Sequence, residues 1–187
     1  MSSTATTTTV PGYIAGTWTL DPTHSEVGFS VRHLMVSKVR GKFTRFEGEL
    51  VTAEDPLLSS VTADIELDSI DTGEPNRDAH IRSADFFDTE NHSTMSYRST
   101  GIRPTGDGWI VDGDLSLHGV TRQVPLKLEL NGFLPDSPMG TRAGFSATGE
   151  ISRKDFGIEF NMPLEGGGVV ISDKVSLHLE VEAILKG

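Results

Sequence analysis

Residues 74–88, EPNRDAHIRSADFFD, hold the densest group of charged and aromatic side chains in the chain. Asp78 and His80 could act as a general acid and base, the chemistry that a hydrolase or isomerase of a lipid-like substrate would need. Their spacing argues against such a pair, because side chains two residues apart on a helix do not face each other. We therefore predict no catalytic residues, and we keep an enzyme with Asp78 and His80 as acid and base as the alternative hypothesis.

The same stretch is expected to form a short helix over residues 75–84. Pro75 suits the first turn of a helix, where its missing N–H costs nothing. Asp78 and Arg82 are four residues apart, the spacing of an ion pair that supports a helix. Phe86 and Phe87 follow and are expected to anchor the helix over an apolar interior. The segment is thus predicted to be a mainly structural cap that could gate one end of the fold.

The rest of the chain has a hydrophobic period of two. In residues 24–34, HSEVGFSVRHL, apolar Val27, Phe29 and Val31 alternate with small or polar residues. Comparable runs occupy residues 60–70, 108–119, 123–133, 142–153 and 174–185. Strict alternation is typical of strands with one buried and one wet face, and such strands are antiparallel as a rule. We predict an all-β sandwich or up-and-down barrel in residues 16–187, after a flexible Ser/Thr-rich tail in residues 1–15.

Composition narrows the classes of function. The net charge of −11 argues against nucleic-acid binding, because a phosphate backbone needs a basic surface. It also disfavours electrostatic docking on anionic membranes. No apolar run approaches the ~20 residues that span a bilayer. The N-terminus does not resemble a secretory signal. We therefore expect a cytoplasmic protein without an integral membrane segment.

The histidines do not have the spacing of a metal site. No HExxH or His-x-His pattern occurs, and no Gly-rich phosphate loop is followed by Lys, so neither a metal nor a cofactor is expected. His118 and His178 are expected at the surface, and His24 at the entry to a strand. His33 is in register with inward-facing Val31, so it either has a structural partner or contacts a ligand head group.

Small residues recur on the apolar faces of the expected strands. They are Gly48, Ala63, Gly113, Ala143, Ala147 and Gly149. One interpretation is that they relieve the bends of a barrel. The other is that they leave a dry channel between larger side chains, which an apolar ligand could fill.

Five blocks of the sequence, in order, resemble the YceI-like, polyisoprenoid-binding proteins. They are residues 18–50, 71–97, 111–130, 144–158 and 171–185, which include WTLDPTHSEVGFSVRH, DAHIRSADFFD and DGDLSLHGVT. The resemblance implies an extended, eight-stranded antiparallel barrel similar to lipocalins, with a helix between strands and a long hydrophobic tunnel. It also implies a polyprenyl chain, a prenylated quinone or a fatty-acid derivative as ligand, often a dimer, and no firmly assigned catalysis.

We therefore predict a homodimeric carrier, storage or buffer protein for a long-chain apolar ligand. From the strand register, the residues expected to contact the ligand tail are Val27, Phe29, Val31, Phe46, Leu50, Ile65, Leu67, Met95, Tyr97, Leu115, Leu117, Leu126, Leu128, Phe145, Leu177 and Leu179. The head group is expected at one mouth of the tunnel. The candidate head-group contacts are His33, Arg77, Asp78, His80 and Tyr97.

Overall fold

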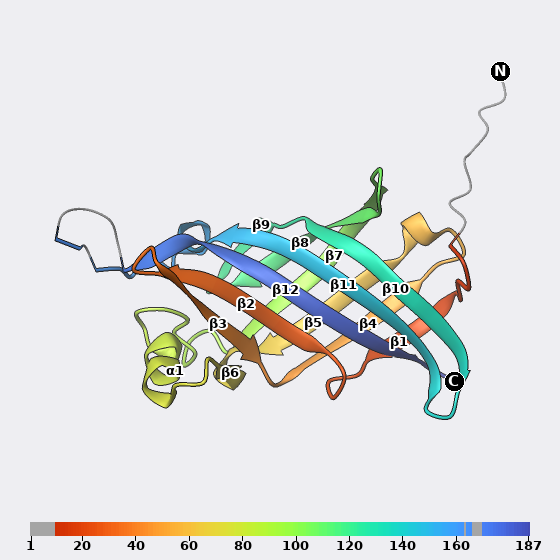
Figure 1. Ribbon diagram of the computed structural model, residues 1–187, viewed down its shortest axis with the longest axis horizontal. Helices are drawn as coiled ribbons and strands as arrows, with labels where there is room; N and C mark the ends of the chain where they lie inside the picture. Colours follow the sequence, from red (N-terminus) through yellow and green to blue (C-terminus); the bar gives the residue numbers. More distant parts are fainter. Residues whose placement is uncertain (1–9, 163, 166–169) are drawn as a thin grey trace, which may run out of the picture.

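The structure is a computed structural model that describes residues 10–162, 164–165 and 170–187 (Figure 1). Its strands are β1 (Gly16–Leu20), β2 (Glu26–His33), β3 (Ser37–Phe43), β4 (Phe46–Thr52), β5 (Ser60–Glu66), β6 (Ile70–Asp71), β7 (Thr94–Pro104), β8 (Trp109–Leu117), β9 (Val120–Gln123), β10 (Leu126–Ser137), β11 (Gly140–Ser152) and β12 (Ile171–Leu185). The helix α1 spans Pro75–Arg82, and the 3-10 turns are η1 (Pro56–Leu58), η2 (Leu67–Ser69) and η3 (Arg153–Phe156).

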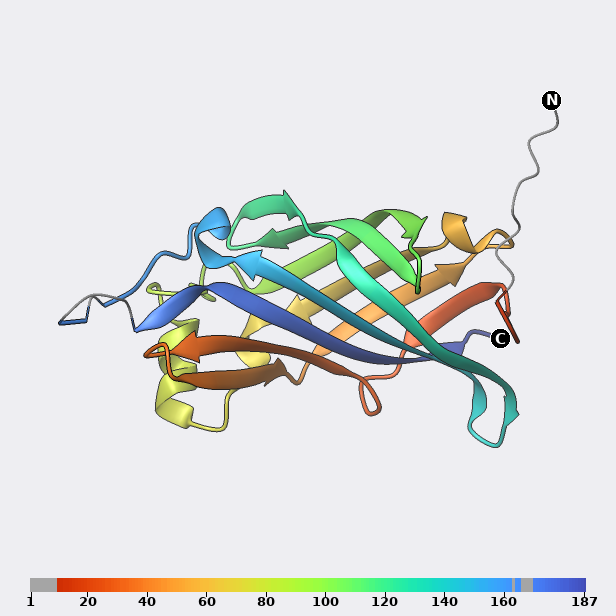
Figure 2. The same ribbon diagram turned by 45° about the horizontal axis from the view of Figure 1, so that its top comes forward.

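Eight antiparallel strands close into a ring in the order β1, β4, β5, β7, β8, β10, β11 and β12, and β12 pairs back on β1. The long strand β12 has a second partner, because its first residues pair with β2 while its last ones pair with β1. The β2–β3 hairpin therefore extends the wall at the end where α1 lies (Figures 1 and 2). The predicted eight-stranded antiparallel barrel is confirmed.

The alternation of side chains determines which face of each strand turns inward. In β8, Val111, Leu115 and Leu117 are buried, whereas Asp114 between them is exposed. Successive side chains of a strand point to opposite faces, so a period of two places all the apolar residues of one strand inside. The inward-facing side chains of the strands are therefore mainly apolar.

The helix α1 forms where the sequence places it and ends two residues earlier than expected, at Arg82. Pro75 occupies its first turn, and the Glu74 carboxylate caps it by accepting hydrogen bonds from the N–H groups of Asn76 and Arg77. The 3-10 turn η3 follows β11 directly. Among the described residues, no helix is both long and apolar enough to cross a membrane.

The predicted ion pair between Asp78 and Arg82 is wrong. Asp78 is buried, and its carboxylate accepts a hydrogen bond of 2.9 Å from the N–H of Thr72. The Arg82 guanidinium donates instead to the backbone carbonyls of Asp68 and Ile70, at 2.9 and 3.1 Å. Both side chains thus fasten α1 to the chain around β6, contacts that helical spacing alone does not indicate.

Residues 1–15 were predicted to form a flexible tail. Residues 1–9 of it lie outside the described part of the chain. Residues 10–15 contact the barrel. The Tyr13 hydroxyl donates to the Ala53 carbonyl, and its ring lies edge-on to Phe133 with centroids 5.4 Å apart. Ile14 packs against the apolar cluster at this end of the barrel.

An apolar cluster around Trp18 fills the barrel at the end away from α1. Trp18 is fully buried, and its indole N–H donates to the Thr52 hydroxyl at 2.8 Å. Leu20, Ala143 and Ala183 are buried against it. The cluster closes this end, so any space inside the barrel lies between Trp18 and α1.

Charged side chains lie beside this cluster, just after β1. The guanidinium Nη1 of Arg142 lies 2.8 Å from Asp21 Oδ2 and 2.7 Å from Glu182 Oε1. His24 Nδ1 lies 2.7 Å from the same Asp21 oxygen. These hydrogen bonds, first from Arg142 and then from His24, lower the pKa of Asp21 to about 2. The network joins the end of β1 to β11 and β12.

We expect this network to make stability depend on pH. The pKa of Asp21 is lower in the folded protein than in the unfolded chain, where it is about 3.9. Its contribution is therefore present above about pH 4 and is lost as the pH falls towards 2. Asp21→Asn should lower the free energy of unfolding at pH 7 by about 1–2 kcal/mol and flatten the decline in acid. Urea denaturation at pH 7, 5 and 3 measures both effects.

Asp64→Asn is the control for this experiment. The Asp64 carboxylate also pairs with an arginine, Arg98, at 3.0 Å, but both side chains are exposed. An exposed pair contributes only about 0.2–1 kcal/mol, so this variant should keep the pH dependence of the natural protein. An Asp21→Asn protein with the natural acid dependence would contradict the role given to Asp21.

Candidate functional site

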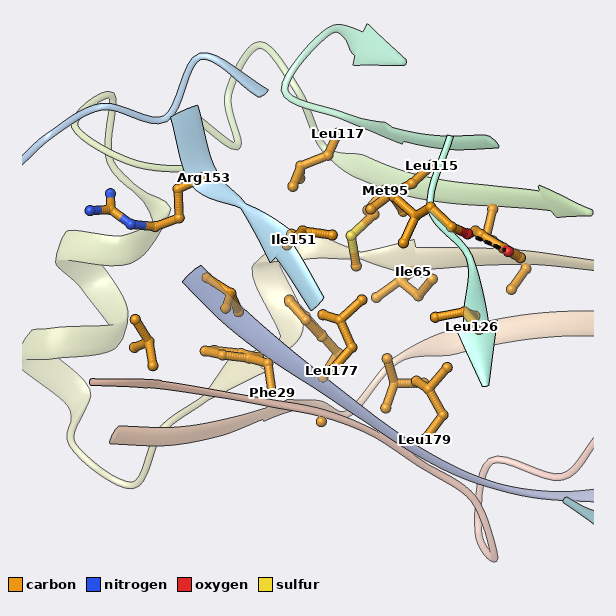
Figure 3. A pocket seen from close by; sticks show the side chains of 18 of the residues that line it. Phe29, Ile65, Met95, Leu115, Leu117, Leu126, Ile151, Arg153, Leu177 and Leu179 are labelled. Atoms are coloured by element: carbon orange, nitrogen blue, oxygen red, sulfur yellow. Dashed lines mark hydrogen bonds between the residues drawn. The ribbon is translucent and has the colours of Figure 1, made fainter. Parts of the chain in front are cut away.

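The barrel encloses an apolar cavity of about 510 Å³ between the Trp18 cluster and α1. Pockets for small molecules commonly measure about 300–1,000 Å³. Figure 3 shows Phe29, Leu177 and Leu179 on one side of this space and Ile65 and Met95 on the other. The cavity is therefore built from the inward faces of strands that are far apart in the sequence.

Most residues predicted to contact a ligand tail line this cavity. They are Val27, Phe29, Val31, Leu50, Ile65, Met95, Tyr97, Leu115, Leu117, Leu126, Leu128, Phe145, Leu177 and Leu179. Phe46 and Leu67 do not. Phe46 is partly buried against the core at the start of β4, and Leu67 is fully buried in η2. The strand β5 ends at Glu66, and Leu67 belongs to the following 3-10 turn. Extending the alternation of β5 by one residue therefore wrongly places Leu67 in the cavity. Contact of the lining residues with a ligand stays a prediction.

The small residues of the inner faces lie in three different surroundings. Ala63 and Ala147 line the cavity and leave room in it. The glycines are covered by large neighbours: a Cβ on Gly113 would lie 2.4 Å from Cζ of Tyr97, and one on Gly48 would lie 2.5 Å from Cδ1 of Leu20. These glycines let a large side chain lie flat against the wall. Ala143 belongs to the Trp18 cluster.

Tyr97 contributes its ring to the cavity and its hydroxyl to the wall. The hydroxyl donates to the Val124 carbonyl at 2.9 Å. Burial, followed by the nearby charges of Asp112 and Asp114, raises the pKa of this hydroxyl far above its usual range. The head-group role predicted for Tyr97 therefore lacks a free donor, because the proton is already bonded inside the protein.

Basic side chains line the end of the cavity nearest α1. They are Arg32, His33, Arg77, His80 and Arg153, and the described residues that line the cavity include no Asp or Glu. His33 is half-buried, and its ring has no hydrogen bond to any of the residues that the structure describes. An electronegative group at this end would meet the guanidinium groups of Arg32 and Arg77. His80 is already paired with the Asp85 carboxylate, which lies outside the cavity lining.

Arg77 is positioned by the turn that precedes α1. Its Nε donates to the Thr72 hydroxyl at 2.8 Å, and its Nη2 donates to the Thr72 carbonyl at 2.7 Å. Thr72 is itself held by the buried Asp78. Asp78 does not line the cavity, and its carboxylate is turned towards Thr72. Instead of the predicted contact with a head group, Asp78 therefore holds Thr72, which in turn positions Arg77.

Arg153 also lines the cavity, although its local sequence does not predict this. It is buried at the start of η3, and its guanidinium donates to the carbonyls of Ile158, Phe160 and Ser172 at 3.0–3.2 Å. Burial lowers its pKa. Figure 3 shows it at the α1 end of the cavity. Its neighbours, Ser-Arg-Lys-Asp, are typical of an exposed turn, so nothing in the local pattern indicates burial.

Asp78 and His80 do not form the acid–base pair of the alternative hypothesis. His80 Nε2 lies 2.8 Å from Asp85 Oδ2, whereas the Asp78 carboxylate is turned to Thr72. Each group therefore has another partner. Their separation follows from helix geometry, as the spacing predicted.

Aromatic rings hold α1 over the cavity. The rings of His80, Phe86 and Phe160 lie edge-to-face with one another, with centroids 5.0–5.2 Å apart. The ring centroids of Phe87 and of Phe43 in β3 are 6.1 Å apart. The predicted anchoring of the helix by Phe86 and Phe87 is confirmed, and α1 covers this end of the barrel (Figure 1).

Within residues 10–162, 164–165 and 170–187, two groups of side chains have potential metal-ligand atoms within 4.8 Å of one another. In the first, Asp21, His24 and Glu182, the carboxylates are already paired with Arg142. The second consists of Asp88, His92 and His118. In each group two residues share one loop and the third, Glu182 or His118, comes from a distant part of the chain, so sequence spacing alone does not reveal the group. The absence of a bound metal stays a prediction.

Comparison with known proteins identifies the fold and the family. The family model for the YceI-like domain matches residues 18–183. A UPF0312 protein of Vibrio cholerae is 37% identical over 167 residues, which cover 87% of this chain and 83% of that protein.

Two solved structures have the same fold. The Campylobacter jejuni YceI protein is 25% identical, with a TM-score of 0.71 and coverage of 95% of this chain and 100% of that one. A polyisoprenoid binding domain from Saccharophagus degradans is 18% identical, with a TM-score of 0.63 and coverage of 92% and 100%. Because the family match extends from β1 to β12 and includes most of the residues around the cavity, the chain belongs to the YceI-like domain family.

Proposed function

We propose that this protein binds a long-chain apolar molecule in its cavity and serves as a carrier, store or buffer for it. A polyisoprenoid, a prenylated quinone or a fatty-acid derivative has the required chemistry. The observation that carries the proposal is the apolar cavity of about 510 Å³, closed at one end by the Trp18 cluster. Each methylene moved from water into such a space contributes about 0.8 kcal/mol. The structural similarity to a polyisoprenoid binding domain supports the same interpretation.

The distribution of charge suggests which way the ligand lies. The tail would extend towards Trp18, and the head group would remain near α1, among His33, Arg77 and His80. Arg77 is held by Thr72 through Nε and Nη2, and its Nη1 forms no hydrogen bond with the described residues. A carboxylate, a phosphate or a carbonyl oxygen would therefore suit this end better than a cationic group.

Binding without catalysis is the simpler interpretation of these contacts. The acid–base alternative needs Asp78 and His80 to act together, yet both are bonded to other residues. The homodimer and the cytoplasmic location stay predictions. Light scattering of the purified protein measures the first, and cell fractionation measures the second.

A first experiment identifies what the cavity holds. Solvent extraction of the purified protein, followed by mass spectrometry, should release a stoichiometric prenyl or acyl compound. Ala147→Phe should then fill part of the cavity and weaken the binding of a fluorescent prenyl or fatty-acid probe about tenfold or more, because Ala147 lines the space. The fold should persist, since the added ring has room to occupy.

Thr148→Phe is the matched control, because Thr148 is the next residue of β11 and its side chain is exposed. It should leave probe affinity unchanged. If the extract holds no lipid and the natural protein takes up no probe, the proposed function is wrong. Equal affinities for the Ala147→Phe and natural proteins would show that the probe binds elsewhere.

A second experiment tests the position of the head group. The natural protein should bind oleate more tightly than oleyl alcohol, because only the carboxylate is attracted by the basic end of the cavity. Arg77→Gln should reduce this preference a few-fold, since an exposed ion pair contributes about 0.2–1 kcal/mol. Arg122→Gln, a change at an exposed residue outside the cavity, should not alter it. Equal preferences in the Arg77→Gln and natural proteins would place the head group elsewhere.

A further inference from the structure

The tip of the β2–β3 hairpin exposes three consecutive apolar residues. Leu34, Met35 and Val36 are 40%, 56% and 83% exposed. The turn is tight, because the N–H of Val36 donates to the His33 carbonyl at 3.2 Å. The hairpin thus presents a small apolar surface to solvent.

The backbone of this turn does not suit the residues that occupy it. Leu34 and Met35 have φ angles of 52° and 62°, which lie in the left-handed region. Gly and Asn adopt this conformation most readily, and bulky side chains are rare in it. Strain of this kind is retained at functional sites more often than elsewhere.

The flanks of the same hairpin carry uncompensated positive charge. The strand register places Arg32 directly opposite Lys38, and like charges in such a pair destabilise a sheet. Arg32, Lys38 and Arg40 are exposed, and none forms an ion pair within the part of the chain that the structure describes. The chain has no acidic residue between Glu26 and Glu47, although its net charge is −11.

The hairpin lies at the rim of the cavity. At the base of the hairpin, three residues line the cavity: Arg32, His33 and Val39. The N–H of Leu34 donates to the Val170 carbonyl at 2.8 Å, and Val170 also lines the cavity. The hairpin and α1 lie at the same end of the barrel (Figure 2). The apolar tip is therefore continuous with the basic end of the cavity.

We propose that the β2–β3 hairpin docks the protein on an anionic lipid bilayer. Leu34, Met35 and Val36 would enter the interfacial layer, and Arg32, Lys38 and Arg40 would contact lipid phosphates. Apolar insertion and basic charge together give a reversible membrane contact that neither provides alone. The two features that are unfavourable in water, the exposed apolar turn and the like-charge pair, both become favourable at such a surface.

The inference rests on the proposed function only for its purpose, since a bilayer is where a long-chain apolar ligand is dissolved. Docking itself needs no ligand. A bilayer also fits the hairpin better than a second copy of this chain does. A two-fold contact would bring the basic flanks of both copies together, whereas anionic lipids complement them.

Vesicle flotation tests the proposal. The purified full chain is mixed with vesicles of phosphatidylcholine alone, or of phosphatidylcholine and phosphatidylglycerol at 3:1, and spun through a density gradient. The natural protein should float with the anionic vesicles, and less of it should float with the neutral ones or at high salt, because salt screens the attraction. A natural protein that stays at the bottom with both vesicles overturns the proposal.

The double variant Leu34→Asn/Met35→Gly isolates the apolar tip. Asn and Gly tolerate the left-handed conformation better than Leu and Met, so the variant should fold at least as stably as the natural protein, which a thermal melt checks. Its bound fraction on anionic vesicles should fall about tenfold. Lys38→Gln/Arg40→Gln should lower binding to anionic vesicles only.

The matched control is Leu134→Asn/Met139→Gln. Leu134 and Met139 are 56% and 60% exposed on the β10–β11 hairpin, at the opposite end of the barrel. This control should float like the natural protein. Equal flotation of Leu34→Asn/Met35→Gly and the natural protein overturns the proposal. The proposal is also overturned if light scattering shows that Leu34→Asn/Met35→Gly converts a dimer into a monomer, because the hairpin would then be a contact between two copies of the chain.

Failure of the proposed function gives a different result. If the protein floats with anionic vesicles but takes up no prenyl or fatty-acid probe, the membrane-docking proposal stands and the proposed ligand-binding function is wrong. Leu34→Asn/Met35→Gly should still take up the probe in solution, because neither residue lines the cavity. The two inferences can therefore fail separately.

Discussion

The closure of the sheet on itself is the constraint on which the rest of this structure depends. The last residues of β12 pair with β1, so that eight strands form a ring. Closing a sheet gives each strand one inner and one outer face, and alternating side chains are sorted between them. The apolar interior and its cavity follow from that closure, because inward-facing residues of distant strands then converge on one space.

The two ends of the ring differ because β12 has two partners. At one end its residues meet β1, and Trp18 with its neighbours fills the barrel. At the other end it pairs with β2, and the wall extends into a hairpin that does not close the barrel by itself. The helix α1, its aromatic anchors and the segment held by Arg153 cover this end instead. The polarity of the cavity, apolar at Trp18 and basic at α1, follows from this difference.

The contacts around α1 show which features local spacing predicts and which depend on the tertiary structure. Helical spacing correctly separates Asp78 from His80. It does not reveal that Asp78 turns to Thr72, or that Arg82 reaches the carbonyls around β6, because those partners are brought near by the path of the chain. The same reason hides Arg153, whose partners lie in the segment after η3 and at the start of β12. Strand alternation places Leu177 and Phe29 correctly and misplaces Leu67, where the strand gives way to a 3-10 turn.

The sequence by itself determined the strands, the position of the single α-helix among the described residues, and which face of each strand is apolar, since these depend on periods of two and 3.6 along a continuous segment. The motifs in their order also indicated the family. Only the tertiary structure decided which strands close the ring, where the cavity ends, and which charges meet at its rim. Those features depend on pairs of residues far apart in the chain. The positive charge of the β2–β3 hairpin shows this well: net charge is a sum over the sequence, but attraction to a surface depends on where the fold places each charge.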